Sequence, residues 1–340
     1  MANNTTSACP WDLSPQYFYA SHCLDVFVYH YLAIIYVAVG CSGHLILLAA
    51  FYKQSKTERA HGYQVIYSIS KTFEIFTFGM FLQAIVIQSI DSYKYTWINQ
   101  NYVAMFIFGY IFSGLHIPFI ICSLLLAVAM AADRVFAILR PIIYKNINRT
   151  KHQLLSAVVC LLIGLFTGII YLYPAKVVWV KELRLYMIDV DWLFVMENIV
   201  SNVCDHFRLY CRVGGTAILL FFDCFMVILF KKRSIKVNAM KANKESSTGP
   251  ASSRAKERAL LWINIYQACS MLLSQMPHVL WVHVFGRFAT DWNECYKSVI
   301  ASVADASVMI TDISDFFIVI AINKRMRKLV KDVMPKCQSH

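Results

Sequence analysis

The sequence predicts an all-α membrane protein: a seven-transmembrane helix bundle with the N-terminus outside and a short cytoplasmic amphipathic helix after the seventh span. Three observations support this fold class. Of the 340 residues, 58% are hydrophobic and 15% are charged, whereas about 25% are charged in an average soluble domain. Seven mostly apolar segments are each long enough to cross a bilayer core, which takes about 20 residues of helix. Finally, Lys and Arg gather in alternate connections between these segments.

The apolar segments lack the alternation with period two that is typical of a membrane β-barrel. We therefore expect helices, which satisfy their own backbone hydrogen bonds in lipid. The chain divides into an extracellular N-terminal segment at 1–27, a transmembrane domain at 28–322 and a cytoplasmic tail at 323–340, with no separate soluble domain. The predicted spans are, in order, 28–52, 64–90, 101–132, 153–175, 213–230, 259–284 and 298–322.

The basic residues give the orientation. The connections at 53–63, 134–151 and 231–258 and the tail at 324–336 hold 23 of the 32 Lys and Arg residues. Basic connections stay in the cytoplasm, so we expect an extracellular N-terminus at the plasma membrane. The first residues carry no basic stretch, and no cleavable signal peptide is predicted. The net charge of +12 flanks membrane spans, which argues against nucleic-acid binding.

Several modification sites follow from this orientation. Asn3 and Asn4 begin glycosylation sequons in the outer segment. Cys337, after the amphipathic stretch of the tail, is either a palmitoylation site or a plain free thiol. Five cysteines lie in outer segments, where disulfides persist, and they allow at most two internal bridges with the pairing left open. These disulfide candidates are Cys9, Cys23, Cys204, Cys211 and Cys295.

An Asp-Arg pair marks the inner end of the third span. Asp133 and Arg134 directly follow the apolar segment, and a Pro-Ile-Ile-Tyr run that ends at Tyr144 comes shortly after them. An Arg beside an apolar span is costly unless it has a partner or reaches an interface. The pair is therefore a candidate functional site.

The seven spans, together with the run from Asp133 to Tyr144, resemble the rhodopsin-like G-protein-coupled receptors. That family carries Asp-Arg-Tyr, then Ala-Ile and Pro-Leu-x-Tyr, in this place. The resemblance implies a switch in which Arg134 is held by Asp133 and by an acid of span six, and is released to open a cleft for a heterotrimeric G protein. Glu257 precedes Pro277 by 20 residues, a rise of about 30 Å. It is the candidate latch for Arg134 or, alternatively, one more solvated charge.

Spans six and seven depart from the family pattern. Where the family has Cys-Trp-x-Pro, this chain reads Ser-Gln-Met-Pro, so Pro277 still predicts a hinge but the Trp is missing. Gln275 either contacts ligand or bonds a neighbouring helix. Where the family has Asn-Pro-x-x-Tyr, this chain reads Asp-Phe-Phe-Ile-Val from Asp315, so we expect a straighter seventh helix.

Polar residues near the middle of the spans form a second candidate site. By the resemblance, Glu74 matches the acid of span two, Ser123 a residue of the family's sodium pocket, Asp315 the motif Asn and His44 the Asn of span one. Together with Asp312, the carboxylates could bind sodium or share a proton. Alternatively, Lys71, one turn from Glu74, forms a structural ion pair with it.

The candidate ligand-binding residues lie in the outer halves of the spans. They are Ser113, His116, Gln275, His278, Trp281 and Asp305. Pockets in helix bundles are mostly apolar with a few converging polar groups, which fits this set. His116 stands where amine receptors of the family carry an Asp, which argues against a monoamine. Span seven contains no Lys, which argues against a retinal Schiff base.

The divergence of spans one, six and seven resembles the nematode serpentine chemoreceptors. This resemblance implies a chemosensory receptor that binds a small extracellular ligand, with no cofactor and no enzymatic activity. Alternatives are a neuropeptide receptor of the same fold, a seven-span ligand-gated channel, or a transporter that uses the mid-membrane acids. A transporter is less well supported because no internal repeat and no paired broken helices are visible.

Overall fold

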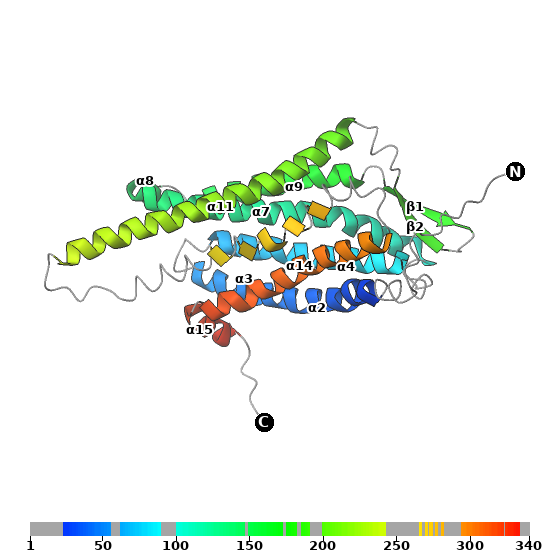
Figure 1. Cartoon of the computed structure of the whole chain (residues 1–340), viewed down its shortest axis with the longest axis horizontal. Coiled ribbons are helices and arrows are strands. Elements are labelled where there is room, and N and C mark those ends of the chain that lie inside the picture. The colour runs from blue at the N-terminus through cyan, green and yellow to red at the C-terminus, as the bar shows by residue number, and fades with distance from the viewer. Residues whose placement is uncertain are drawn as a thin grey trace, which may run out of the picture.

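The computed structural model is almost entirely helical and forms an elongated bundle (Figure 1). The residues described are 23–55, 62–89, 100–146, 149–172, 175–181, 185–190, 199–242, 294–322 and 324–333, with short helical pieces between 265 and 281. Five of the described helices are long and apolar enough to cross a membrane. They coincide with the first five predicted spans, and the count of seven stays a prediction.

The first membrane-capable helix runs from Cys23 to Ser55. Two π-helical segments, η1 (Phe27–Leu32) and η2 (Tyr36–Gly40), flank the short α2 (Ala33–Ile35) and precede α3 (Cys41–Ser55). A π-helical turn is wider than an α-helical turn, so each such segment changes the direction in which later side chains point. The second helix, α4, covers Gly62–Ser89.

The third helix begins at α6 (Tyr102–Met105), where the Asn101 side chain accepts hydrogen bonds from the first backbone N–H groups. It continues through η5 (Phe106–Ile111) into α7 (Phe112–Leu139). The apolar segment predicts an end at 132, but the helix extends to 139. Asp133 and Arg134 consequently lie inside the last turns of α7, where the helix holds both side chains.

The following elements are α8 (Pro141–Asn146), α9 (Arg149–Leu172) and the strands β1 (Ala175–Val180) and β2 (Leu185–Val190). The two strands form an antiparallel hairpin in which Trp179 pairs with Tyr186, with ring centroids 4.7 Å apart. A hairpin at this position differs from the all-helical prediction. The aromatic cross-strand pair of Trp179 and Tyr186 stabilises it.

The chain then forms α11 (Ile199–Ala242), α14 (Glu294–Ile322) and α15 (Lys324–Val333). The apolar segment predicts a span at 213–230, so α11 is longer than expected at both ends. The helix α14 matches the predicted seventh span and carries Asp305, Asp312 and Asp315. It is not among the five membrane-capable helices of the described residues.

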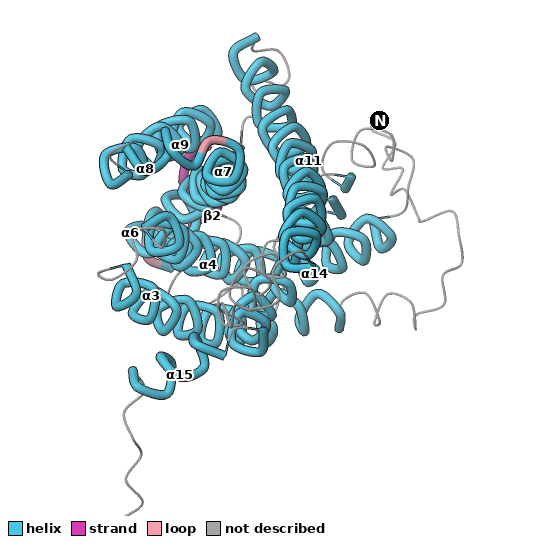
Figure 2. Tube along the Cα trace, turned by 90° about the vertical axis from the view of Figure 1, so that its left-hand side faces the viewer, coloured by secondary structure: helices cyan, strands magenta, loops and turns pink. Residues whose placement is uncertain are grey.

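Figure 2 shows α7 beside α4, α9 and α11, and these neighbours share extensive contacts with it. Small residues allow close approach, as is typical of membrane helices. A Cβ atom on Gly164 of α9 would collide with the backbone carbonyl of Pro118 in α7. A Cβ atom on Gly43 of α3 would lie 2.7 Å from the Phe316 ring of α14. Both glycines therefore fix the spacing of their helix pairs.

The two ends of the bundle differ. The hairpin lies at one end, while α8 and α15 lie at the other, here called the α8 end (Figure 1). The helix α15 forms where the sequence predicts an amphipathic helix, and its Met326 and Val330 are buried against Leu47 and Phe51 of α3. The basic α15 lies at the α8 end, and the orientation of the chain in the membrane stays a prediction.

Candidate functional site

The α8 end contains the first candidate site, a group of polar side chains around the last turns of α7. The Tyr144 hydroxyl on α8 donates a hydrogen bond of 2.6 Å to Oδ2 of Asp133. The bond ties the connection after α7 back onto the helix, and Tyr144 is buried by this contact. The Pro at the start of α8 is suited to a first helical position, so the run of residues predicted from sequence does form a local structural unit.

Arg134 is half-buried beside this unit. Its charge interacts with three groups: Asp223 of α11, Asp133 and Tyr144. Asp223 is the strongest of these electrostatic partners, although its carboxylate makes no hydrogen bond within the described residues. We call Asp133, Arg134, Tyr144 and Asp223 the inner switch cluster.

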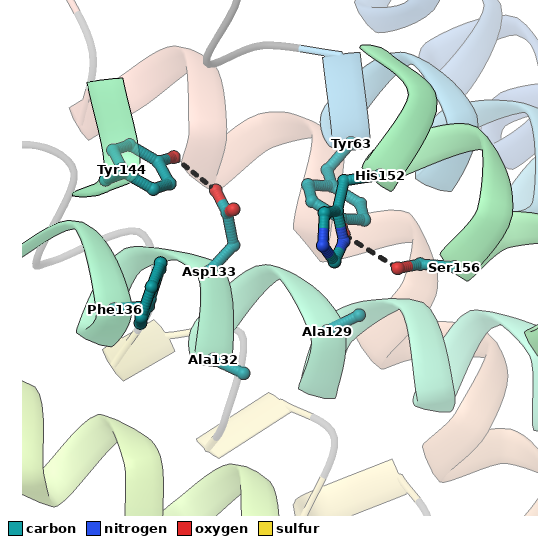
Figure 3. A pocket seen from close by; sticks show the side chains of 8 residues that line it. All are labelled: Tyr63, Ala129, Ala132, Asp133, Phe136, Tyr144, His152 and Ser156. Carbon is teal, nitrogen blue, oxygen red and sulfur yellow. Dashed lines mark hydrogen bonds between the residues drawn. The ribbon is translucent and has the colours of Figure 1, made fainter. Parts of the chain in front are cut away.

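A cavity of about 430 Å³ opens beside Asp133 (Figure 3). Tyr63 of α4 donates a hydrogen bond of 2.9 Å to Ser156 of α9 on one side of it, and the bond between Tyr144 and Asp133 lies on the other. The Asp133 carboxylate therefore faces a space between α4, α7 and α9 rather than open solvent. The lining residues are Tyr63, Ala129, Ala132, Asp133, Phe136, Tyr144, His152 and Ser156.

The second candidate site lies in the middle of the bundle. The Lys71 ammonium contacts Glu74 Oε1 at 2.7 Å and Asp312 Oδ1 at 2.8 Å, and each of these three side chains is 3% exposed or less. The Tyr36 hydroxyl donates to the other Asp312 oxygen at 2.9 Å. The predicted pair of Lys71 with Glu74 is confirmed. It extends through Asp312 to α14 and through Tyr36 to the first helix.

Further polar groups border this centre. Ser270, in a described piece of the predicted span six, donates to Asp315 Oδ1 at 2.8 Å. Ser123 lies 3.0 Å from Ser70. His44 is buried, and neither of its ring nitrogens makes a hydrogen bond within the described residues. We call Tyr36, His44, Lys71, Glu74, Ser123, Ser270, Asp312 and Asp315 together the central polar cluster.

An ammonium that binds two carboxylates already fills the place that a dissolved cation would occupy between Glu74 and Asp312. Buried charges are tolerated only when they are paired and hydrogen-bonded. The geometry therefore favours the structural ion pair, and sodium binding stays a prediction.

The ligand candidates that are described lie towards the hairpin end. The His116 ring is buried and stacks on Phe81, with centroids 4.4 Å apart and an interplanar angle of 11°. Asp305 is half-buried, and its charge acts on the Tyr29 hydroxyl. Nearby, Ser298 and Ser302 donate hydrogen bonds to Asp25. His116 thus packs against α4, and Asp305 lies near the first helix.

Other predicted residues are only partly described. Pro277 and Trp281 lie in helical pieces of the predicted span six, and Ser113 lies in α7 without a described side chain. Cys23 and Cys211 have free thiols, while the side chains of Cys204 and Cys295 are not described. The disulfides therefore stay predictions. The predicted residues outside the described part of the chain are Asn3, Asn4, Cys9, Glu257, Gln275, His278 and Cys337.

Three residues of these sites were not foreseen from the sequence. Tyr36 and Ser270 each complete a hydrogen bond to a buried Asp, but a tyrosine and a serine within apolar helices give no distinctive signal. Asp223 differs, because an acid inside a span is unusual enough to suggest a function by itself. That signal was present in the sequence.

Neither a protein-family model nor a curated protein sequence matches this chain. Among solved structures, the fold matches squid rhodopsin with a TM-score of 0.66 and 15% sequence identity, over 92% of this chain and 81% of the squid protein. The chain therefore shares the helical-bundle fold of squid rhodopsin, and five of its described helices are long and apolar enough to cross a membrane. At this identity, the likeness shows the fold alone.

Proposed function

We propose that this protein is a G-protein-coupled receptor of the plasma membrane, with its N-terminus outside and no enzymatic activity. It binds a small extracellular ligand, in a chemosensory role like that of the nematode serpentine chemoreceptors, and activates a heterotrimeric G protein through Asp133 and Arg134. The inner switch cluster is the observation that carries this proposal. An Asp-Arg pair at the end of a central helix, in a receptor-like fold, can act as a switch because the Arg can change ionic partners when the helices move.

The proposed mechanism follows from the cluster. Tyr144 occupies one oxygen of Asp133, which limits how firmly Asp133 can hold Arg134. Ligand binding near the hairpin end shifts the helices, and Arg134 changes partners at the α8 end. An equilibrium of this kind responds to a ligand only as far as the ligand prefers one of the two states.

Nucleotide exchange on a purified heterotrimeric G protein tests this function. The receptor, reconstituted in lipid nanodiscs, would be screened against volatile and water-soluble small molecules. Short peptides would be included to test the alternative of a neuropeptide receptor. We expect at least one compound to accelerate exchange with the native chain. Arg134→Gln should abolish the acceleration, whereas Arg140→Gln, at an exposed Arg just after the same helix, should preserve it.

An N-terminal epitope tests the orientation separately. Antibody access in intact cells is expected for a receptor and not for a channel whose N-terminus is inside. Ligand-gated current or substrate uptake without any nucleotide exchange would replace the receptor proposal with the channel or the transporter.

A further inference from the structure

Asp223 of α11 is a buried acid of the inner switch cluster, but the proposed mechanism gives it no role of its own. Its side chain is 5% exposed, and neither carboxylate oxygen has a hydrogen-bond partner within the described residues. A buried carboxylate without a partner costs several kcal/mol, so acids inside spans are usually paired. The position therefore calls for a cationic partner.

The packing of α11 against α7 identifies that partner. A Cβ atom on Gly215 of α11 would lie 3.1 Å from the Leu124 side chain of α7. Both helices run towards the α8 end (Figure 1). Asp223 follows Gly215 by eight residues and Arg134 follows Leu124 by ten, which are rises of about 12 and 15 Å along the two helices. The two charged side chains therefore lie at similar levels of neighbouring helices.

The charges of Arg134 and Asp223 act on each other without direct contact. Arg134 is the charged group that acts on Asp223 within the described part of the chain. A guanidinium on a long side chain can close such a gap by changing rotamer, and its planar fork binds both oxygens of a carboxylate. Asp133 is a weaker competitor because Tyr144 already donates to one of its oxygens.

We propose that Asp223 is a restraining partner of Arg134: it binds the guanidinium in the resting receptor and holds α11 against α7 until activation releases it. The inference rests on the proposed receptor function and deepens it, since it places a restraint in the fifth span, independent of Glu257. Arg134 bound to Asp223 is not available at the cytoplasmic face. Loss of the acid therefore shifts the receptor towards its active state.

A double-mutant cycle on the detergent-purified full chain tests the pair without ligand or G protein. Arg134→Gln leaves Asp223 as a buried charge without its cation, and we expect the thermal midpoint to fall by roughly 5 °C or more. Adding Asp223→Asn removes that charge and should recover at least half of the loss. If the fall in thermal midpoint of the double variant equals the sum of the falls in the two single variants, the pair does not exist.

The matched control is Asp312→Asn in the Arg134→Gln background. Asp312 is also a buried acid, but it binds Lys71, so it should give no recovery. Recovery by Asp312→Asn equal to that by Asp223→Asn would mean a general effect of charge removal and would overturn the pair. Should Arg134→Gln fail to fold, surface abundance replaces the thermal midpoint, with the same expected recovery by Asp223→Asn only.

Measurements of nucleotide exchange test the restraint itself. Asp223→Asn should raise nucleotide exchange without ligand about threefold, and Asp223→Glu, which keeps the charge, should return it towards the native level. Unchanged or lower exchange in Asp223→Asn, in a receptor that responds to ligand, overturns the restraint. If no variant and no native protein promotes exchange while the stability cycle shows coupling, the pair is supported and the proposed receptor function fails.

Discussion

The central polar cluster and the inner switch cluster differ in how completely their charges are satisfied. In the central cluster, the Lys71 ammonium touches two carboxylates, and Tyr36 occupies a further oxygen of Asp312. In the inner cluster, Arg134 has neighbouring acids but Asp223 has no hydrogen bond within the described residues. A saturated network favours one arrangement, whereas an unsaturated one leaves a cation free to change partners. The first is suited to hold helices together and the second to switch.

The largest effect is expected from breaking the saturated cluster. Lys71→Met leaves Glu74 and Asp312 as facing buried acids, which should cost about 3 to 5 kcal/mol of unfolding free energy. Thermal unfolding and surface abundance would both fall sharply. Adding Asp312→Asn should restore part of both. A Lys71→Met protein as stable as the native chain would mean that the ion pair does not hold the helices together.

A smaller loss is expected from Tyr36→Phe. It removes one hydrogen bond to a carboxylate and leaves the ring in place, for a cost of about 1.5 to 3 kcal/mol. The measurement is again the thermal midpoint of the purified protein. Tyr31→Phe, at an exposed tyrosine of the first helix, is the matched control and should change little. Equal losses at the two positions would argue against the bond to Asp312.

In the inner cluster, the bond from Tyr144 to Asp133 is only partly buried, so Tyr144→Phe should cost less, about 1 kcal/mol of stability, but it should alter signalling. Without the hydroxyl, both oxygens of Asp133 become available to Arg134. We expect lower ligand-free nucleotide exchange at equal surface expression, because Arg134 is then held more firmly. Higher exchange would show instead that the Tyr144 bond is itself part of the restraint.

The smallest structural effect is expected from Glu257→Ala. Replacing a charge at the predicted inner end of span six changes stability by about 0.5 kcal/mol or less, but a latch on Arg134 would be lost. Ligand-free exchange should rise, and it should rise further when Asp223→Asn is added, because the two acids restrain Arg134 separately. No change in Glu257→Ala at equal surface expression would leave Asp223 as the restraint that matters.

Much of the fold was predictable because the lipid bilayer allows few backbone conformations. A long apolar segment must be helical to satisfy its backbone, and the first five predicted spans appear as helices. The ends were harder to predict. The helix α11 begins at Ile199 because a helix can continue beyond the apolar core, where hydropathy no longer marks it. The hairpin is too short to be distinguished from a loop by its pattern.

The sites were predictable where their contacts are local in sequence. Lys71 and Glu74 are one helical turn apart, and Tyr144 lies eleven residues from Asp133. The bond from Tyr36 to Asp312 joins residues 276 positions apart. It depends on how the first helix is rotated, and the π-helical segments η1 and η2 change that rotation. Apolar periodicity alone carries no information about such segments.

The pairing of Lys71 with Glu74 also bears on how the protein is made. With a mean hydropathy of 1.2, Gly62–Gln83 is the least apolar of the five membrane-capable helices, and a single Lys or Asp at the centre of a span opposes insertion by about 2.5 to 3.5 kcal/mol. Because the two charges neutralise each other within one helix, this segment can enter the bilayer during synthesis before α14 exists. Asp312 is synthesised late, in α14. Its ion pair with Lys71 can therefore form, and join α14 to the bundle, only when the chain is nearly complete.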